Sequence, residues 1–278
     1  MYELKCRTET IGKQYIWLDQ TDSTNEVIKR LLRDGQTIEG EAGKVSKMIV
    51  GSIHHGLTVL ADHQTGGKGR SGREWVDEVG TNIAMSILLQ PGLGAESISM
   101  VTLVSAMAVA KAIKDTTGLK TEIKWPNDVI IGGRKVCGIL TELELGAGHY
   151  CVIVGIGINV NQAYFEDELE DKATSLLNES EGCVPYDREV IAAAVLENLE
   201  HYYDIFCKTG NMSELMYEYN RILVNRNNTV KVLDPSENVE GISRGIDDMG
   251  RLLVELENGD IHHIYAGEVS VRGVYGYV

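Results

Sequence analysis

The chain contains the stretch Gly66-Gly67-Lys68-Gly69-Arg70-Ser71-Gly72-Arg73, which sets four glycines beside three cations, without an acid, in a protein of formal net charge −15. Glycine lets backbone N–H groups turn toward a ligand, and lysine and arginine bring positive charge to a phosphate or carboxylate. A cationic loop in an acidic protein favours an anionic small molecule over a nucleic-acid surface. By composition alone, a solvated surface loop is an equally good interpretation, so the flanking sequence has to decide.

The segments on either side of this loop predict strands and helices. Residues Leu57–His63 predict a strand that runs into the loop, and Thr81–Gln90 predict the next strand. Apolar residues at helical spacing then predict a helix over Ser97–Thr117. Upstream, Ser23 and Glu26 have the spacing of a capping box, which predicts the start of a first helix and gives Ser23 a purely structural interpretation at this point.

Three further strands are predicted over Thr121–Trp125, Val136–Leu145 and Tyr150–Val160. A tight turn is expected at Gly132-Gly133. The run CVIVGIGINV is almost continuously apolar, which predicts a central strand buried on both faces. Two helices follow, one capped by Asp187 and reaching residue 207, and one over residues 213–224.

The pattern changes near Asn225. Short strands punctuated by glycine and proline follow, and they predict a small barrel. These strands are expected over residues 229–234, 239–246, 251–257, 261–266 and 268–272. We therefore expect one domain over residues 1–224 and a second over 225–278.

Length and composition narrow the class of protein. With 278 residues, 43% hydrophobic and 24% charged, the chain is long enough for about two globular domains. It holds no run of 18 apolar residues, so no membrane span is expected. Five cysteines without a C-x-x-C pair predict reduced thiols in a cytoplasm and no metal site of the zinc type. Acids outnumber bases 41 to 26, which argues against DNA as a partner.

Neither glycine-rich string is a common nucleotide fingerprint. A Walker A motif needs G-x-x-x-x-G-K-[ST], but Gly69 follows Lys68, and Asp62 stands at the place of the first glycine. The string Gly155-Ile156-Gly157-Ile158-Asn159 lacks the third glycine of a dinucleotide fingerprint and lies inside a predicted strand. A nucleotide site in this chain has to be of another type.

Two more strings combine polar residues with strand ends. In Lys124-Trp125-Pro126-Asn127-Asp128 the proline marks a strand end, and the polar residues fit a surface turn as well as a site. In the next string Lys135 stands at a strand start, and Gly138 allows a ligand or backbone to come close. Farther along that strand Glu142 and Glu144 alternate with leucines, so we expect them to point outward.

Together these strings resemble those of biotin–protein ligases, over Asp22 to Arg272. The matching blocks are Asp22-Ser23-Thr24-Asn25, Gln64 to Trp75, Lys124 to Asp128, Lys135 to Leu140, Gly155 to Asn161 and Gly267 to Arg272. Lys68 stands where the family often has arginine, so the charge is kept and the bidentate fork is lost.

The resemblance implies an α+β fold. The expected catalytic domain, residues 1–224, is a mixed sheet with helices on one side, similar to class II aminoacyl-tRNA synthetases, and residues 225–278 form an SH3-like barrel. The implied reaction joins biotin to ATP as biotinyl-5′-AMP, with release of pyrophosphate, and then transfers biotin to a lysine of a carrier domain. The glycine loop is expected to be a lid that is mobile without ligand.

The resemblance also assigns site residues. Those implied to bind biotin are Ser23, Thr24, Asn25, Gln64, Lys68, Gly69, Arg70, Lys135 and Gly138. Those implied on the nucleotide side are Arg70, Arg73, Trp75, Asn127 and Asn159. Lys135 and Arg70 are the expected catalytic residues, because they bring charge to the carboxylate and phosphate. No protein ligand for Mg²⁺ is predicted, since the ATP phosphates supply oxygens.

The implied partner is a biotin carboxyl carrier protein or domain of acetyl-CoA carboxylase or a related carboxylase. No DNA and no membrane are expected, and a homodimer is as compatible with the family as a monomer. Lipoate ligation on the same core fold is one alternative. Another is a ligase that also represses transcription, which needs an N-terminal helix-turn-helix domain, and only 22 residues precede Ser23.

Overall fold

The computed structural model describes residues 4–34, 45–49, 54–94, 97–146, 149–166, 169–233, 238–266 and 270–273. In chain order the elements are β1 (Tyr15–Leu18), α1 (Thr24–Asp34), β2 (Val45–Ile49), β3 (Thr58–Ala61), β4 (Gly67–Lys68), the 3₁₀ turn η1 (Arg70–Gly72), β5 (Glu74–Trp75), β6 (Ile83–Leu89), α2 (Ile98–Thr117), β7 (Glu122–Lys124), β8 (Asp128–Ile131), β9 (Arg134–Gly146), β10 (His149–Ile158), α3 (Leu176–Glu179), α4 (Arg188–Thr209), α5 (Met216–Ile222), β11 (Thr229–Leu233), β12 (Val239–Ile246), β13 (Leu252–Glu255), β14 (Ile261–Ile264) and β15 (Ser270–Gly273).

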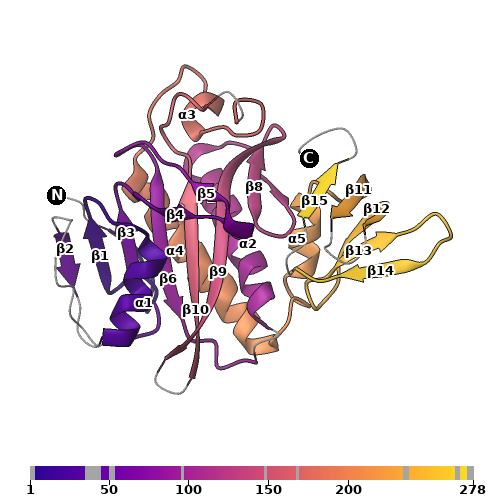
Figure 1. Ribbon diagram of the computed structural model, residues 1–278, viewed down its shortest axis with the longest axis horizontal. Helices are drawn as coiled ribbons and strands as arrows, with labels where there is room; N and C mark the ends of the chain where they lie inside the picture. The colour runs from indigo at the N-terminus through magenta and orange to yellow at the C-terminus, as the bar shows by residue number, and fades with distance from the viewer. Residues whose placement is uncertain are drawn as a thin grey trace.

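Within these residues, eight strands form a mixed sheet in the order β2-β1-β3-β6-β10-β9-β8-β7. Strands β1 and β3 run parallel, and the other neighbours run antiparallel. A separate antiparallel sheet at the C-terminal end has the order β14-β13-β12-β11-β15 (Figure 1). The predicted α+β class, a mixed sheet followed by a C-terminal β-unit, is confirmed.

Helices cover both faces of the large sheet, whereas the resemblance implied one. Helices α2 and α4 pack on one face, and α2 is buried along most of its length because it lies between the sheet and α4. Helix α1 covers the other face, where Val27, Ile28 and Leu31 pack on the strands. Side chains alternate along β1, so Trp17 belongs to the first core and Ile16 to the second.

The centre of the sheet is the β9–β10 hairpin. Strand β10 lies between β6 and β9, which confirms the predicted central strand. Strands β8 and β9 are joined by Gly132 (φ 57°) and Gly133 (φ 81°), so the predicted tight turn is present, with both glycines in the left-handed region. Strands β1, β2 and β8, of four or five residues each, were missed from sequence.

The C-terminal sheet is anchored to the rest of the chain by buried polar contacts. The indole Nε1 of Trp125 donates to the carbonyl of Gly250 at 3.1 Å, in the β12–β13 turn. The side chain of Asn220 on α5 donates to the carbonyl of Ile246 and accepts from its N–H. In the described part of this sheet β14 and β15 are not paired, so the predicted barrel is open along that edge. Residues 267–269 of the predicted last strand lie outside the described residues.

Candidate active site

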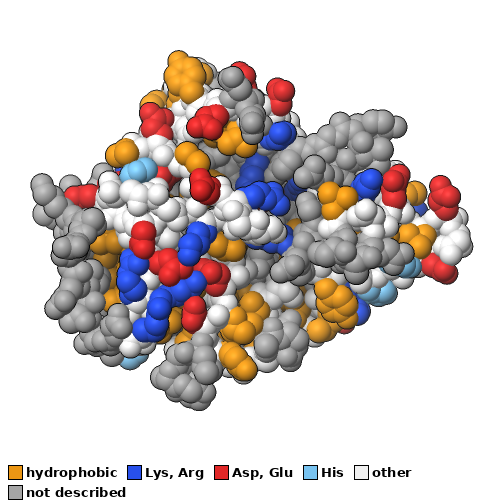
Figure 2. Space-filling model, viewed as in Figure 1, with side chains coloured by type: hydrophobic (Ala, Val, Ile, Leu, Met, Phe, Trp, Pro, Cys, Tyr) orange, Lys and Arg blue, Asp and Glu red, His pale blue; other side chains and the backbone are white. Residues whose placement is uncertain are grey.

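A cavity of about 840 Å³ lies against the face of the sheet that α1 covers only in part. Its walls come from the start of α1, the glycine loop, the turn after β7, strands β9 and β10, parts of residues 159–166 and 169–173, and Val271 of β15. Figure 2 shows Lys and Arg side chains gathered in the hollow at the middle of this face. The predicted site residues all line this one cavity: Ser23, Thr24, Asn25, Gln64, Lys68, Gly69, Arg70, Arg73, Trp75, Asn127, Lys135, Gly138 and Asn159.

The first turn of α1 is held by side chains from β6 and from the segment between β3 and β4. Gln64 accepts from the N–H of Thr24 at 2.8 Å and from its hydroxyl at 3.1 Å. The hydroxyl of Ser86 on β6 donates to Asn25 Oδ1 at 2.5 Å and lies 2.6 Å from Thr24 Oγ1. These contacts hold the buried side chains of Thr24 and Asn25 at one end of the cavity.

The predicted capping box at this helix start is wrong. The N–H of Ser23 donates to Asp22 Oδ1 at 2.7 Å. The carboxylate of Glu26 lies instead near Lys68, with Oε1 2.8 Å from its Nζ. The spacing matched the motif, but Asp22 stands next to the amide and reaches it first, which leaves Glu26 available for the glycine loop.

The glycine loop is a tight hairpin over the cavity mouth. Strands β4 and β5 pair, and the N–H of Gly69 donates to the carbonyl of Arg73 at 2.7 Å. At the tip Ser71 (φ 56°) and Gly72 (φ 72°) adopt left-handed conformations, which reverse the chain. Arg70 points inward and donates to Asn127 Oδ1 at 2.8 Å. Burial lowers the pKa of Arg70, while Arg73 stays exposed.

Trp75 lies flat over a strand glycine. A Cβ added at Gly157 would come within 2.6 Å of the indole, so the ring lies directly on the β10 backbone. In the described part of the chain the buried Nε1 of Trp75 has no hydrogen-bond partner. A buried donor without a partner is costly, so it fits an acceptor atom supplied by a ligand.

The position of Lys135 depends on the carboxylate of Asp128 and on the lack of a side chain at Gly138. Its Nζ lies 2.7 Å from Asp128 Oδ1. A Cβ at Gly138 would lie 2.9 Å from that same Nζ, so glycine makes room for the lysine to fold across the strand. We predicted that Gly138 allows close packing against a ligand. Its observed role is to make room for the side chain of Lys135.

Two asparagines line the cavity and also hold neighbouring segments. Asn127 accepts from Arg70 with Oδ1 and donates to the carbonyl of Ile139 with Nδ2 at 3.1 Å. Asn159 donates from Nδ2 to the carbonyl of Thr174 at 3.0 Å. The predicted nucleotide contacts of both residues stay predictions, because the observed bonds by themselves account for the two amides.

Sequence reasoning gave no role to three contributors to the site. Ser86, Gly155 and Gly157 lie on the cavity side of β6 and β10, and a Cβ at Gly155 would come within 2.6 Å of Asn25 Oδ1. Two glycines two residues apart in an apolar strand open a gap on one face, which was a usable signal. The prediction that Glu142 points outward was wrong, because it faces α1 and accepts from Asn25 Nδ2 at 2.6 Å.

The chain matches the family model described as "Biotin/lipoate A/B protein ligase family" over residues 41–159 and that of the "Biotin protein ligase C terminal domain" over residues 227–272. It is 33% identical to the bifunctional ligase/repressor BirA of Bacillus subtilis, over 95% of this chain and 76% of that protein. It is 31% identical to the biotin–[acetyl-CoA-carboxylase] ligase of Mycobacterium tuberculosis, over 84% and 86%. A biotin protein ligase from Aquifex aeolicus, solved with biotin and ATP, superposes with a TM-score of 0.78 at 30% identity, covering 94% and 99%.

Proposed function

Because the chain belongs to the biotin/lipoate A/B protein ligase family, as a biotin protein ligase, we propose an assignment of its cavity to the two steps of that reaction. The enzyme activates biotin with ATP and transfers it to a lysine of a biotin carboxyl carrier protein. One observation carries the assignment: residues drawn from five separate stretches of sequence meet in a single cavity.

Biotin lies at the α1 end of the cavity. The hydroxyls of Ser23 and Thr24 and the amides of Asn25 and Gln64 are polar groups on a largely apolar floor. A ureido ring presents two N–H donors and one carbonyl acceptor, and such neutral hydroxyl and amide groups match both. The valerate chain then runs beneath Gly69 toward the cations, so that its carboxylate reaches Arg70 and Lys135.

The first step joins two anions. A biotin carboxylate oxygen attacks the α-phosphorus of ATP, the bond from that phosphorus to the bridging oxygen breaks, and pyrophosphate leaves. Arg70 and Lys135 offset the repulsion and bind the charge that grows on the phosphoryl oxygens, because both are already held in place by Asn127 and Asp128.

In the second step the neutral amine of the carrier lysine attacks the carbonyl carbon of the acyl-phosphate. The bond from that carbon to the phosphate oxygen breaks, AMP leaves, and the amine loses a proton. Lys135 is the group near enough to bind the oxyanion that forms at the carbonyl, since it borders both the carboxylate end and the nucleotide end of the cavity.

The nucleotide occupies the other end of the cavity, against Trp75, Asn127 and Asn159, with Arg73 at the entrance. The indole N–H of Trp75, which has no partner among the described residues, suits a phosphate or ribose oxygen. Mg²⁺ enters with ATP and adds charge neutralisation at the phosphates. We expect the ATP phosphates to supply most of its oxygens.

The division into residues 1–224 and 225–278 follows the change from the mixed sheet to the antiparallel one. Val271 of β15 lines the cavity, so the C-terminal unit closes one side of the site rather than standing apart from it. The described helices include none long and apolar enough to cross a bilayer. The five cysteines are free thiols, which suits a reducing compartment such as the cytoplasm.

The direct test incubates the protein with ATP, Mg²⁺ and a biotin carboxyl carrier domain, with either biotin or lipoate. Intact-mass measurement of the carrier should show the mass gain of one biotin and no gain with lipoate. A gain with lipoate alone would establish the alternative. A second assay, gel shift with operator-like DNA, should show no binding, because the protein is acidic overall.

Neutral substitutions of Arg70 and Lys135 test their role in the first chemical step separately from substrate binding. We expect Arg70→Gln and Lys135→Met each to slow pyrophosphate release by about 10² to 10³-fold, as for loss of one group that binds developing charge. Rapid-quench measurement of pyrophosphate at saturating ATP and biotin checks this. Wild-type rates in both variants would exclude the proposed roles.

A further inference from the structure

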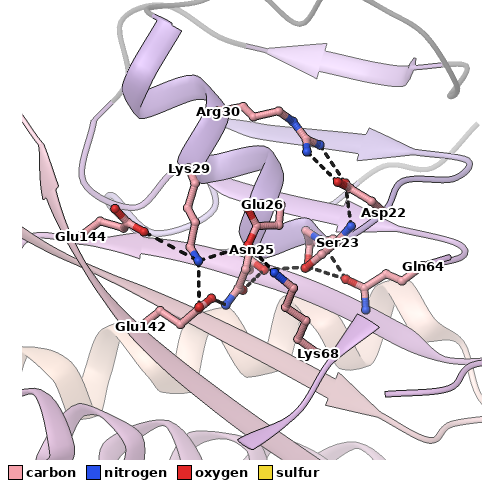
Figure 3. A network of polar contacts seen from close by, with 12 residues as sticks. Asp22, Ser23, Asn25, Glu26, Lys29, Arg30, Gln64, Lys68, Glu142 and Glu144 are labelled. Atoms are coloured by element: carbon pink, nitrogen blue, oxygen red, sulfur yellow. Dashed lines mark hydrogen bonds and ion pairs between the residues drawn. The ribbon is translucent and has the colours of Figure 1, made fainter. Parts of the chain in front are cut away.

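A chain of charged side chains connects α1, the glycine loop and β9 on the biotin side of the cavity (Figure 3). We call Glu26, Lys29, Lys68 and Glu142 the α1 network. Lys29 is its centre, since its Nζ lies 3.2 Å from Glu26 Oε1 and 2.7 Å from Glu142 Oε1. Only 12% of the Lys29 side chain is exposed, so solvent screens these two contacts less than those of a surface ion pair.

At one end the network holds Asn25. Glu142 uses one carboxylate oxygen for Lys29 and the other for Asn25 Nδ2 at 2.6 Å. Ser86 occupies Asn25 Oδ1 from the other side. The amide of Asn25 is therefore fixed in one orientation, and it keeps a second N–H and a second lone pair for a ligand.

At the other end the network holds the glycine loop. Lys68 lies 2.8 Å from the Glu26 oxygen that also contacts Lys29. The ammonium of Lys68 is therefore directed to α1. The Lys68 contact lowers the pKa of Glu26 despite partial burial, and Glu142 and Glu26 outweigh burial in raising the pKa of Lys29, so Glu26 and Lys29 are both charged at neutral pH.

Helix periodicity explains why three of the participating residues meet. Asn25 and Lys29 are four residues apart, and Glu26 and Lys29 are three apart, so all lie on one side of α1. Without Lys29, the carboxylates of Glu26 and Glu142 would face each other across a partly buried gap and would move apart. Asn25 would then move with Glu142, and Lys68 would move with Glu26.

We propose that Lys29 is a positioning residue, which sets the biotin-facing amide of Asn25 and the closed glycine loop together by neutralising Glu26 and Glu142. The proposal rests on the proposed function of the cavity. It predicts that Lys29, which does not line the cavity, controls biotin binding and the retention of biotinyl-5′-AMP, and leaves ATP binding nearly unchanged.

The test compares Lys29→Met with Lys29→Arg and with Lys111→Met. Lys111 also forms an ion pair on a helix, with Asp115, but on the exposed surface of α2, so it is a matched control. For Lys29→Met we expect the biotin Kd by calorimetry and the biotin KM to rise by about tenfold or more, as for loss of a charged hydrogen-bond partner. The ATP KM should change less than twofold, and Lys29→Arg should retain most of the biotin affinity.

The rate at which biotinyl-5′-AMP is released reports on the end of the α1 network that holds the glycine loop. Lys29→Met and Lys68→Met should each speed release of biotinyl-5′-AMP, and the double variant should be no faster than the faster single variant, because both act through Glu26. Should Lys29→Met fail to fold, Glu142→Gln replaces it, since glutamine still accepts from Asn25 but loses the charge that holds Lys29.

The outcomes separate the inference from the function on which it rests. Wild-type protein that neither binds nor turns over biotin would overturn both. Active wild type with an unchanged biotin Kd in Lys29→Met, or with an equal change in Lys111→Met, would overturn the positioning role alone. Additive release rates in the double variant would exclude a shared connection through Glu26.

Discussion

At Gly138, Gly155 and Gly157 the central strands lack a side chain, and in each case a polar or aromatic side chain of the site occupies the space. Lys135 folds over the first, Asn25 lies against the second and Trp75 lies on the third. All three positions lie on the cavity side of the β9–β10 hairpin, where ordinary apolar strand residues would have filled the cavity. These glycines therefore shape the site through the residues that take their place.

Substitution of Gly138 should separate activity from stability. A Cβ there would push Lys135 Nζ, the flexible end of a side chain, so we expect Gly138→Ala to fold with little change in Tm. Displacement of Nζ by about 1 Å should lower kcat/KM by roughly 10²-fold. The control is Leu143→Ala, an exposed position on the same strand. Equal activity of wild type and Gly138→Ala would contradict the placement of Lys135.

The Asp22–Arg30 pair predicts a pH-dependent stability. The guanidinium of Arg30 donates two hydrogen bonds to the Asp22 carboxylate, from Nη1 to Oδ2 at 2.7 Å and from Nη2 to Oδ1 at 2.8 Å. These bonds hold the pKa of that carboxyl well below its usual value. Its stabilisation is therefore present above the ordinary pKa of about 3.9 and is lost as pH falls through the lowered folded value. Because the pair is half exposed, we expect Asp22→Asn to cost at most about 1 kcal/mol at pH 7.

Urea unfolding at pH 7 and pH 3 checks this sign. The difference between wild type and Asp22→Asn should be constant from pH 5 to 8 and shrink below about pH 4. Asp115→Asn on α2 removes a carboxylate of similar exposure that pairs with a lysine instead of an arginine. It should change the free energy of unfolding less than Asp22→Asn does. A difference that grows on acidification would refute the assignment.

At the scale of elements, the glycine loop is a hairpin with few bonds of its own. Two residue pairs join β4 to β5, and the Lys68–Glu26 contact adds a tie to α1. Four glycines make the loop costly to order, so bound biotinyl-5′-AMP should favour its closed form and keep water from the anhydride. Strands β9 and β10, behind the loop, form the part of the site that does not move.

Hydrogen exchange should show this contrast. We expect amides of residues 66–75 to exchange rapidly without ligand and to gain protection with biotin and ATP, while β3, which is fully buried, stays protected in both conditions. Lys68→Met should reduce the protection gained on ligand binding. Full protection of residues 66–75 in the ligand-free protein would show that the loop is not a lid.

At the scale of the whole molecule, the site depends on how the C-terminal sheet is attached. Trp125 lines the cavity and also bonds to Gly250 in the C-terminal sheet. Gly250 (φ 72°) packs so closely on α2 that a Cβ would come within 2.6 Å of Leu103. These contacts hold β15, with Val271, against the cavity.

Loss of the Asn220 contacts should loosen this attachment. Asn220→Ala leaves both backbone polar groups of Ile246 without their partner, and we expect it to destabilise the protein by about 1 to 3 kcal/mol. Thermal unfolding gives the cost, and the ATP KM reports on the cavity. Asn198→Ala on α4 is the control, since that amide bonds within its own helix, to the carbonyl one turn before it. Equal Tm changes in the two variants would contradict an anchoring role.

Some features followed from the sequence by itself because they depend on local chemistry. Apolar periodicity predicted α2, the cap at Asp187 predicted α4, and strand-like runs predicted β9 and β10. Gly132-Gly133 predicted the tight turn before β9. The change near Asn225 predicted the C-terminal sheet. The blocks around Ser23, Arg70, Asn127 and Lys135 identified the family, because their order and residue types are specific even without knowledge of where they meet.

Only the tertiary structure decided which side chains touch. Asn25 and Glu142 are 117 residues apart in sequence, and Lys68 and Glu26 are 42 apart, so no local pattern records these pairs. The same holds for α1, whose position on the second face of the sheet follows from apolar residues on both sides of β1 and β3. Spacing along the chain specifies elements, but the contacts between elements depend on packing, which brings together residues that local sequence leaves unrelated.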